Sequence, residues 1–191
     1  MNYSAEFETV DLIARSSAET RGVDAFALAL IKAERQIRKL FTYLVFQLPC
    51  FTDSDIIRLR EALGSSKKVY FNGVERGFNA LYPRTIGELV GDQYPELRKR
   101  IDNAIDCRNK IFHGQLTSKY LSREDLLAFV VDIRAWCAAL ATGAKLEVGY
   151  DGFARNSFQK SELSDLSRRF KVQFSSIEAY AEFIRQHMES R

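Results

Sequence analysis

Arg108 and His113 are the side chains whose types and spacing best suit chemistry on an anion. Both lie in residues 108–114, which read RNKIFHG. The spacing of apolar residues predicts that this stretch ends a helix and that Arg108 lies on the apolar stripe of that helix. A guanidinium cannot lose its proton, so leaving it unpaired among apolar neighbours is costly. We therefore expect an anion or a second subunit to meet Arg108.

The helix that positions these side chains is predicted from Tyr94 to His113. Pro95 suits a first helical position, and Gly114 suits a C-terminal cap. The apolar stripe is predicted to contain Leu97, Ile101, Ala104, Ile105, Ile111 and Phe112. A polar stripe beside it is predicted to contain Asp102, Asp106, Asn109 and His113.

A purely structural role for these residues is an open alternative. Arg108 can bond an internal carboxylate or extend its head group to water, and His113 can cap the helix and interact with its negative end. An ideal helix also places Arg108 and His113 roughly 140° apart. They converge only if the helix unwinds at Gly114 or if two copies meet across a two-fold axis.

Length and composition predict a mainly helical protein with a full core. The chain has 191 residues, of which 46% are hydrophobic and only three are proline. A net charge of +3 neither requires nor excludes a nucleic-acid partner. Three cysteines in apolar surroundings indicate reduced thiols. We find no run of secretory length and expect the apolar stretches to be too short for a membrane span, which favours a cytoplasmic protein.

The first strong element is a long core helix predicted from Asp24 to Leu48. Its outer face carries four cations, which form either a solvated face or a landing surface for phosphate groups. Those residues are Lys32, Arg35, Arg38 and Lys39.

Further helices complete a predicted antiparallel bundle over residues 1–143. Thr52 and Asp53 cap a shorter helix that ends at Gly64, and the stretch 65–93 suggests short helical turns. Ser122 caps a second long helix that we expect to end at Gly143. The short connection between this helix and the preceding one favours antiparallel packing.

The C-terminal extension, residues 144–191, is expected to pack on the bundle or to swap between two bundles. Apolar residues alternate around 146–150 and again around 170–174, which suggests a small two-stranded ribbon. A final helix is predicted from Ser176 to about Met188, with Ser175 and Glu178 at capping-box spacing.

The arginine, the adjacent polar residue, and the histidine after four intervening positions resemble the motif of the HEPN superfamily. Arg108, Asn109 and His113 carry this resemblance, and it extends at fold level over roughly Asp24 to Gly143. It implies a metal-independent endoribonuclease that works as a homodimer. Such proteins occur in toxin–antitoxin modules and phage defence, so the resemblance also implies an antitoxin or defence-system partner.

The chemistry implied by the resemblance is attack of a ribose 2′-hydroxyl on the adjacent phosphate, leaving 2′,3′-cyclic phosphate and 5′-hydroxyl ends. His113 would exchange protons, Arg108 would neutralise charge on phosphorus, and Asn109 would orient the imidazole or bond a phosphate oxygen. Lys110 and the basic face at Arg35, Arg38 and Lys39 would guide the RNA.

The sequence also departs from this family and leaves alternatives open. Some members are silenced by adenylylation of a tyrosine two residues after the histidine, and Gln115 occupies that place here. No metal-ligand spacing or phosphate-cradling loop is found, so we expect neither a metal nor a cofactor. The alternative functions are a non-catalytic module that binds nucleic acid, a nucleotide or a protein, and a helical adaptor.

Overall fold

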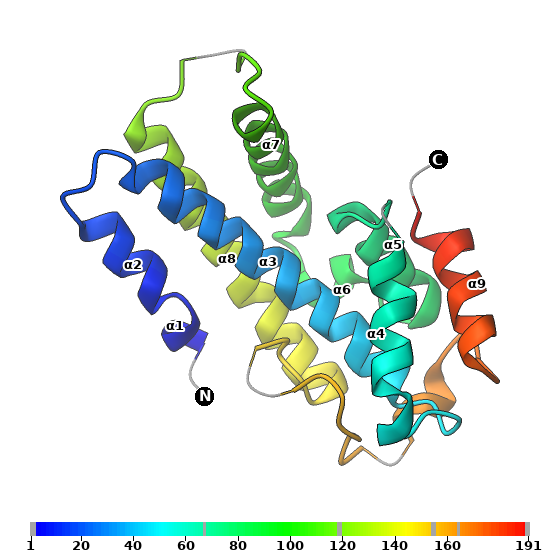
Figure 1. Cartoon of the computed structure of the whole chain (residues 1–191). Helices are drawn as coiled ribbons and strands as arrows, with labels where there is room; N and C mark the ends of the chain where they lie inside the picture. The colour runs from blue at the N-terminus through cyan, green and yellow to red at the C-terminus, as the bar shows by residue number, and fades with distance from the viewer. Residues whose placement is uncertain (1–2, 67, 118–119, 154–155, 164, 190–191) are drawn as a thin grey trace.

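The computed structural model describes residues 3–66, 68–117, 120–153, 156–163 and 165–189, and these are mainly helical (Figure 1). The elements in chain order are α1 (Tyr3–Glu6), α2 (Glu8–Arg15), α3 (Arg21–Phe46), the 3-10 turn η1 (Asp53–Asp55), α4 (Ile56–Ser65), α5 (Phe71–Leu81), α6 (Ile86–Val90), α7 (Tyr94–Phe112), α8 (Arg123–Val148), the 3-10 turn η2 (Leu166–Arg169) and α9 (Ile177–His187).

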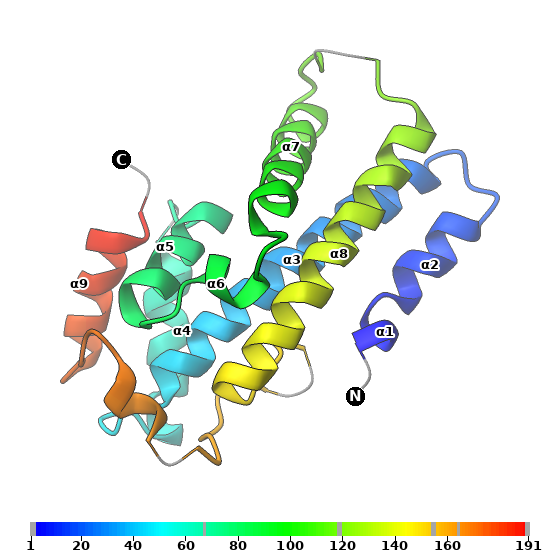
Figure 2. The ribbon, with the colours of Figure 1, turned by 180° about the vertical axis from the view of Figure 1, so that it is seen from behind.

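The two longest helices, α3 and α8, form the centre of the molecule and run side by side (Figures 1 and 2). They run parallel, because Gly22 lies against Arg123 near the start of both helices, and Gln36 donates to the Cys137 carbonyl at 3.0 Å farther along. The prediction of an antiparallel bundle is therefore confirmed for α7 and α8 but wrong for α3 and α8. The reason is that α7 runs opposite to both.

Helix α7 begins at the predicted residue, but its apolar stripe is shorter than expected. Leu97, Ile101 and Ala104 are buried, whereas Ile111 is half-buried and Phe112 is 62% exposed. The prediction that Phe112 contributes to the core is wrong. Its end of α7 points away from the centre of the bundle, as both ribbon views show (Figure 2).

Helix α8 begins with the predicted Ser122 cap, and the Asp125 amide donates to the Ser122 hydroxyl at 3.1 Å. We expected this helix to end at Gly143, but it continues to Val148. Gly143 is needed for close packing instead, since a Cβ there would lie 1.9 Å from the carbonyl oxygen of Leu89. The predicted boundary between bundle and extension thus falls inside a continuous helix.

The predicted β-ribbon is wrong for its first arm, because Leu146 and Val148 belong to α8. No strand occurs among the residues that the structure describes, and residues 170–174 pass as extended chain along the bundle, with the Lys171 amide donating to the Leu81 carbonyl at 2.9 Å. Alternating apolar residues fit this path because alternate side chains face the core. The final helix is confirmed as α9, but its cap is the Ser176 hydroxyl, which accepts from the Ala179 amide, and not the predicted Ser175.

By length and composition alone, α8 could cross a membrane, contrary to our expectation that the apolar stretches are too short. Its inner face nevertheless packs in the core of the bundle, where Ile133, Trp136 and Leu140 are fully buried. A core helix of a soluble protein passes the same test. This helix is therefore weak evidence for a membrane protein.

Candidate functional site

The end of α7 places His113 at a sharp change of chain direction. His113 is the C-cap residue, and Gly114 adopts the left-handed conformation with φ of 62°. The Gly114 amide donates to the Ile111 carbonyl at 3.2 Å, and the Gln115 amide donates to the Lys110 carbonyl at 2.8 Å. These two bonds form a Schellman motif, which is why the sequence requires glycine at this position. The predicted glycine cap is confirmed.

Arg108 meets a carboxylate of its own chain. Its Nη2 donates to Glu34 Oε1, and Glu34 lies on α3. The structure therefore realises the internal ion pair that the sequence left open as an alternative. The pair is not sealed in the core, because the side chains of Arg108 and Glu34 are 32% and 30% exposed.

A hollow of about 520 Å³ opens between α3, α5 and the end of α7, and we call it the motif groove. It is lined by Glu34, Tyr70, Phe71, Asn72, Arg76, Ile105, Asp106, Arg108, Asn109 and His113. A second hollow of about 210 Å³ on the other side of the Arg108–Glu34 pair is also lined by Asn109 and His113, together with Ile31 and Phe112. The three predicted catalytic residues thus share one groove within a single chain.

Asn109 and His113 are exposed, and their contact runs through the backbone. The His113 amide donates to the Asn109 carbonyl at 3.1 Å, and the two side chains follow one another along the wall of the motif groove. Residues spaced by four positions on a helix share a face. The arrangement leaves the imidazole accessible from solvent, as proton transfer to a bound ligand requires.

The sequence reasoning missed four polar residues of the groove, which are Glu34, Tyr70, Asn72 and Arg76. Arg76 Nη2 donates to the Met188 carbonyl at 3.1 Å, so Arg76 both holds the end of α9 and adds positive charge to the groove wall. Tyr70 is 63% exposed and presents an aromatic ring. No local sequence signal could have identified these residues. They lie on α3, on α5 and just before α5, and only the packing of these helices brings them to the groove.

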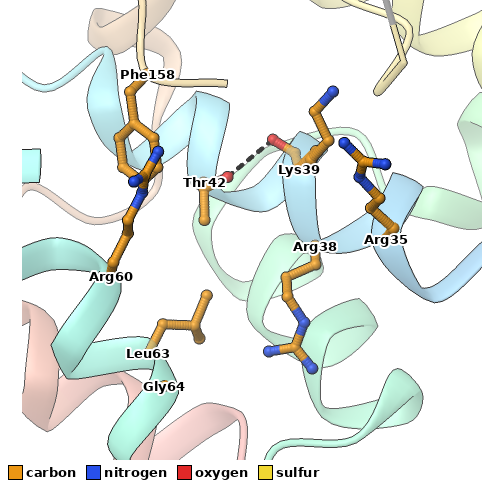
Figure 3. Close-up of a pocket in the computed structure, with 8 residues that line it drawn as sticks. All are labelled: Arg35, Arg38, Lys39, Thr42, Arg60, Leu63, Gly64 and Phe158. Carbon is orange, nitrogen blue, oxygen red and sulfur yellow. Dashed lines mark hydrogen bonds between the residues drawn. The ribbon is translucent and has the colours of Figure 1, made fainter. Parts of the chain in front are cut away.

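The predicted RNA-contacting cations do not line the motif groove. Arg35, Arg38 and Lys39 line a separate hollow between α3 and α4 (Figure 3). Lys110 is half-buried and lines neither this hollow nor the two beside Arg108. The structure therefore brings three of the four cations together, but apart from Arg108 and His113.

Within the part of the chain that the structure describes, no three His, Cys, Asp or Glu side chains are grouped so that they could hold a metal ion. The cysteines are unpaired thiols, and burial raises the pKa of Cys137 far above its usual range. Such a thiol stays protonated and inert at neutral pH. In the motif groove, the arginines can bind an anion, and the histidine and the carboxylates can transfer a proton.

No protein-family model, no curated protein and no solved structure matches this chain.

Proposed function

We propose that the motif groove is the catalytic cleft of a metal-independent endoribonuclease of the HEPN type, which acts as a homodimer and leaves 2′,3′-cyclic phosphate and 5′-hydroxyl ends. The observation that carries the proposal is that Arg108, Asn109 and His113 line one solvent-open groove. A structural arginine and a structural cap would not need to share a cavity.

In this proposal Arg108 is the electrostatic group of the cleft. Glu34 accepts from one nitrogen of the guanidinium and holds the side chain across the groove. The remaining N–H groups have no acceptor among the described residues and can donate to the non-bridging oxygens of a phosphate. Donors fixed in this way stabilise the charge that grows on a pentacoordinate phosphorus.

His113 supplies the proton transfers. A neutral imidazole removes the proton from the 2′-hydroxyl, whose oxygen forms the new bond to phosphorus while the bond from phosphorus to the 5′-oxygen breaks. The leaving 5′-oxygen takes a proton from a second imidazolium, which is His113 of a second copy. Each chain contributes one histidine to the groove, so the acid and the base together need a homodimer.

Exposed apolar residues beside the groove support such a pairing. Ile31 is 56% exposed and Phe112 is 62% exposed, and both line the smaller hollow next to Arg108. Burial of these side chains against a second copy would be favourable and would exclude water from the cleft. Two copies meeting here would bring two motifs together.

Tyr70 and Asn72 fit the recognition of single-stranded RNA. The Tyr70 ring is exposed on the groove wall, and a flat aromatic side chain can stack on an unpaired base. Asn72 can hydrogen-bond to a base or to a ribose hydroxyl. We propose a cytoplasmic toxin or phage-defence role with an antitoxin or defence-system partner, which rests on the sequence motif.

A second candidate function is favoured by the Arg108–Glu34 ion pair. The carboxylate of Glu34 offsets the positive charge of the Arg108 guanidinium. The pair is therefore less suited to stabilising a charged transition state than to binding a ligand. In that case the protein is a non-catalytic module that binds nucleic acid, a nucleotide or a protein.

Cleavage of a fluorescently labelled single-stranded RNA of mixed sequence separates the two functions. We expect Arg108→Ala and His113→Ala each to slow cleavage by at least about 100-fold, the size expected for loss of a charge-stabilising donor or a general base. Arg100→Ala is the matched control, because Arg100 lies on the same helix outside the groove. Cleavage that persists in His113→Ala rejects the proposal, and binding without cleavage by the unmodified protein selects the binding module.

The products test the mechanism. A DNA strand of the same sequence lacks the 2′-hydroxyl and should stay intact, and the 3′ ends of the RNA products should be cyclic phosphates by mass spectrometry. Cleavage should also survive excess EDTA within about twofold, since none of these steps uses a metal. A loss of activity in EDTA contradicts the proposed mechanism.

A further inference from the structure

The hollow between α3 and α4 concentrates positive charge and has a volume of about 240 Å³ (Figure 3). We call it the cationic hollow. Its lining residues are Arg35, Arg38, Lys39, Thr42, Arg60, Leu63, Gly64 and Phe158. Four of these are cations and none is a carboxylate. Figure 3 shows Arg60 and Phe158 on one side of Thr42, and Arg35, Arg38 and Lys39 on the other.

The positive charges of the cationic hollow are not neutralised by ion pairs. Arg38 Nη2 donates to the Val69 carbonyl at 3.3 Å, and Lys39 Nζ donates to the Phe153 carbonyl at 3.2 Å. Carbonyl oxygens satisfy hydrogen bonds but carry no net charge. Among the described residues, no carboxylate pairs with any of the four cations.

The state of Lys39 reflects this imbalance. Burial and the neighbouring charge of Arg35 lower the pKa of Lys39, and they outweigh the opposite effect of Glu6 and Asp151. A bound anion would reverse the repulsion. Ten of the arginines that the structure describes meet a carboxylate, whereas Arg35, Arg38 and Arg60 of the cationic hollow do not.

The remaining surface of the cationic hollow is apolar and partly flat. The Arg60 guanidinium lies 4.9 Å from the centroid of the Phe158 ring, so the two groups present a stacked pair at one side. Leu63 and the aliphatic stems of the arginines add apolar surface to the lining. Such a surface accepts a planar ring, and the cations accept an oxyanion.

We propose that the cationic hollow binds a free mononucleotide, or a phosphate monoester of the same shape. The phosphate of the ligand would lie on Arg35 and the neighbouring cations, and the ring of the ligand would lie beside the Arg60–Phe158 pair. The volume lies just below the range typical of pockets that enclose a whole drug-sized ligand, which suits one nucleotide unit rather than a folded nucleic acid. The inference does not depend on ribonuclease activity.

The site is separate from the motif groove, although the two share a wall. Arg38 lines the cationic hollow and donates to the Val69 carbonyl, and the residue after Val69, Tyr70, lines the motif groove. Glu34 and Arg35 are likewise neighbours on α3 but line different hollows. A ligand in the cationic hollow would therefore contact the chain that holds the wall of the motif groove.

Gly64 offers a direct steric test. Gly64 lines the cationic hollow, and a Cβ there would meet nothing within 4 Å, so a larger side chain can be added at the edge of the hollow without a clash. Gly64→Phe should fill the site without removing any charge, and Gly64→Ala is its matched control because it adds a single carbon. Arg35→Gln removes one exposed cation that makes no ion pair among the described residues, and Arg168→Gln serves as an exposed control that does not line the cationic hollow.

Binding of AMP, measured by calorimetry in the Arg108→Ala/His113→Ala background, tests the inference without interference from the motif groove. We expect AMP to bind, Gly64→Phe to weaken binding at least about tenfold, and Arg35→Gln to weaken it about fivefold. Gly64→Ala should weaken it less than Gly64→Phe does, the Arg168→Gln control should change it less than about twofold, and adenosine and inorganic phosphate should each bind more weakly than AMP.

Three results overturn the inference. They are no measurable AMP binding, AMP binding that Gly64→Phe and Arg35→Gln both leave unchanged, and binding of an RNA pentamer that needs the cationic hollow when AMP does not bind there. Thermal melting of each variant shows whether the fold is intact. If Gly64→Phe fails to fold, Arg35→Gln together with Arg60→Gln decides the question, because both side chains are exposed.

Discussion

Arg98 and Arg108 lie on the same helix, and each donates a hydrogen bond to a glutamate of another helix, but their surroundings differ. Arg98 is 15% exposed and donates through Nε to Glu75 at 2.9 Å. It also donates to Asn72 at 2.8 Å and to Asp102, and it lies over the ring of Phe71. Its hydrogen-bonding capacity is directed into the protein.

Arg108, by contrast, uses one nitrogen for Glu34 and keeps 32% of its side chain exposed on the motif groove. The difference shows that a guanidinium on the inner stripe of a helix can be bonded within the protein at one end of that helix and partly open to solvent at the other. The end of α7 that lies farther from the centre of the bundle leaves its arginine more exposed to solvent (Figure 2). The predictions below test this contrast.

The largest expected effect is on Arg98. We expect Arg98→Ala to lower the free energy of unfolding by about 3–5 kcal/mol, because it leaves the buried carboxylate of Glu75 without its cation. Urea denaturation measures this. The matched control is Arg100→Ala, which breaks ion pairs at a far more exposed side chain and should change the midpoint much less. Equal effects of the two variants would contradict the structural role of Arg98.

A second prediction concerns the pH dependence of the same buried network. Burial and the hydrogen bond from the Tyr94 hydroxyl to Glu75 raise the pKa of Tyr94 to about 12. The unfolded chain releases this proton near pH 10, where the folded protein still holds it. This contribution to stability is therefore complete below pH 10 and is lost as the pH rises through 12.

Tyr94→Phe isolates that contribution. Urea denaturation between pH 8 and 12 should show a steeper loss of stability for the unmodified protein than for Tyr94→Phe. Tyr70 is the matched control, since it is exposed and makes no such bond in the described structure, so Tyr70→Phe should follow the unmodified protein. Identical slopes for all three proteins would reject the assignment to Tyr94.

The third prediction concerns Gly114, which shapes the open end of α7. Its φ of 62° costs about 1 kcal/mol for an L side chain, although a Cβ there would meet nothing within 4 Å. We expect Gly114→Ala to lower stability by about that amount and to slow RNA cleavage, because the turn positions His113. Gly64→Ala is the control in a helix, where alanine is favoured. Full cleavage activity in Gly114→Ala would separate the turn from the site.

Local signals in the sequence predicted the elements well where one residue type has one physical role. The start of α7 at Tyr94, the Ser122 cap and the left-handed Gly114 follow from hydrogen bonding within a few residues. The prediction that α8 ends at Gly143 was wrong because glycine also permits close packing. The backbone that packs against Gly143 belongs to Leu89, which is far away in the sequence. The prediction of a two-stranded ribbon was wrong because an extended chain along a core shows the same alternation of apolar and polar residues as a strand.

The candidate site was predictable only as far as one helix extends. Arg108, Asn109 and His113 were found because their spacing is local. Glu34 and Tyr70 became part of the groove through the packing of α3 and α5 against α7, which no short pattern encodes. Arg35, Arg38 and Lys39 were recognised as cations, but their separation from Arg108 depends on the same packing.

The smallest expected effect on stability is at the Arg108–Glu34 pair, and it completes the contrast with Arg98. Both side chains are about one-third exposed, so solvent screens the pair, and we expect Arg108→Ala and Glu34→Gln each to change the free energy of unfolding by about 1 kcal/mol or less. A double-mutant cycle should give a coupling below the same value. The two variants should instead differ in function, because Glu34→Gln leaves the cation in place and strengthens salt-sensitive RNA binding, whereas Arg108→Ala weakens it. A coupling of several kcal/mol would make Arg108 a structural tie like Arg98, and the motif groove would lose its binding group.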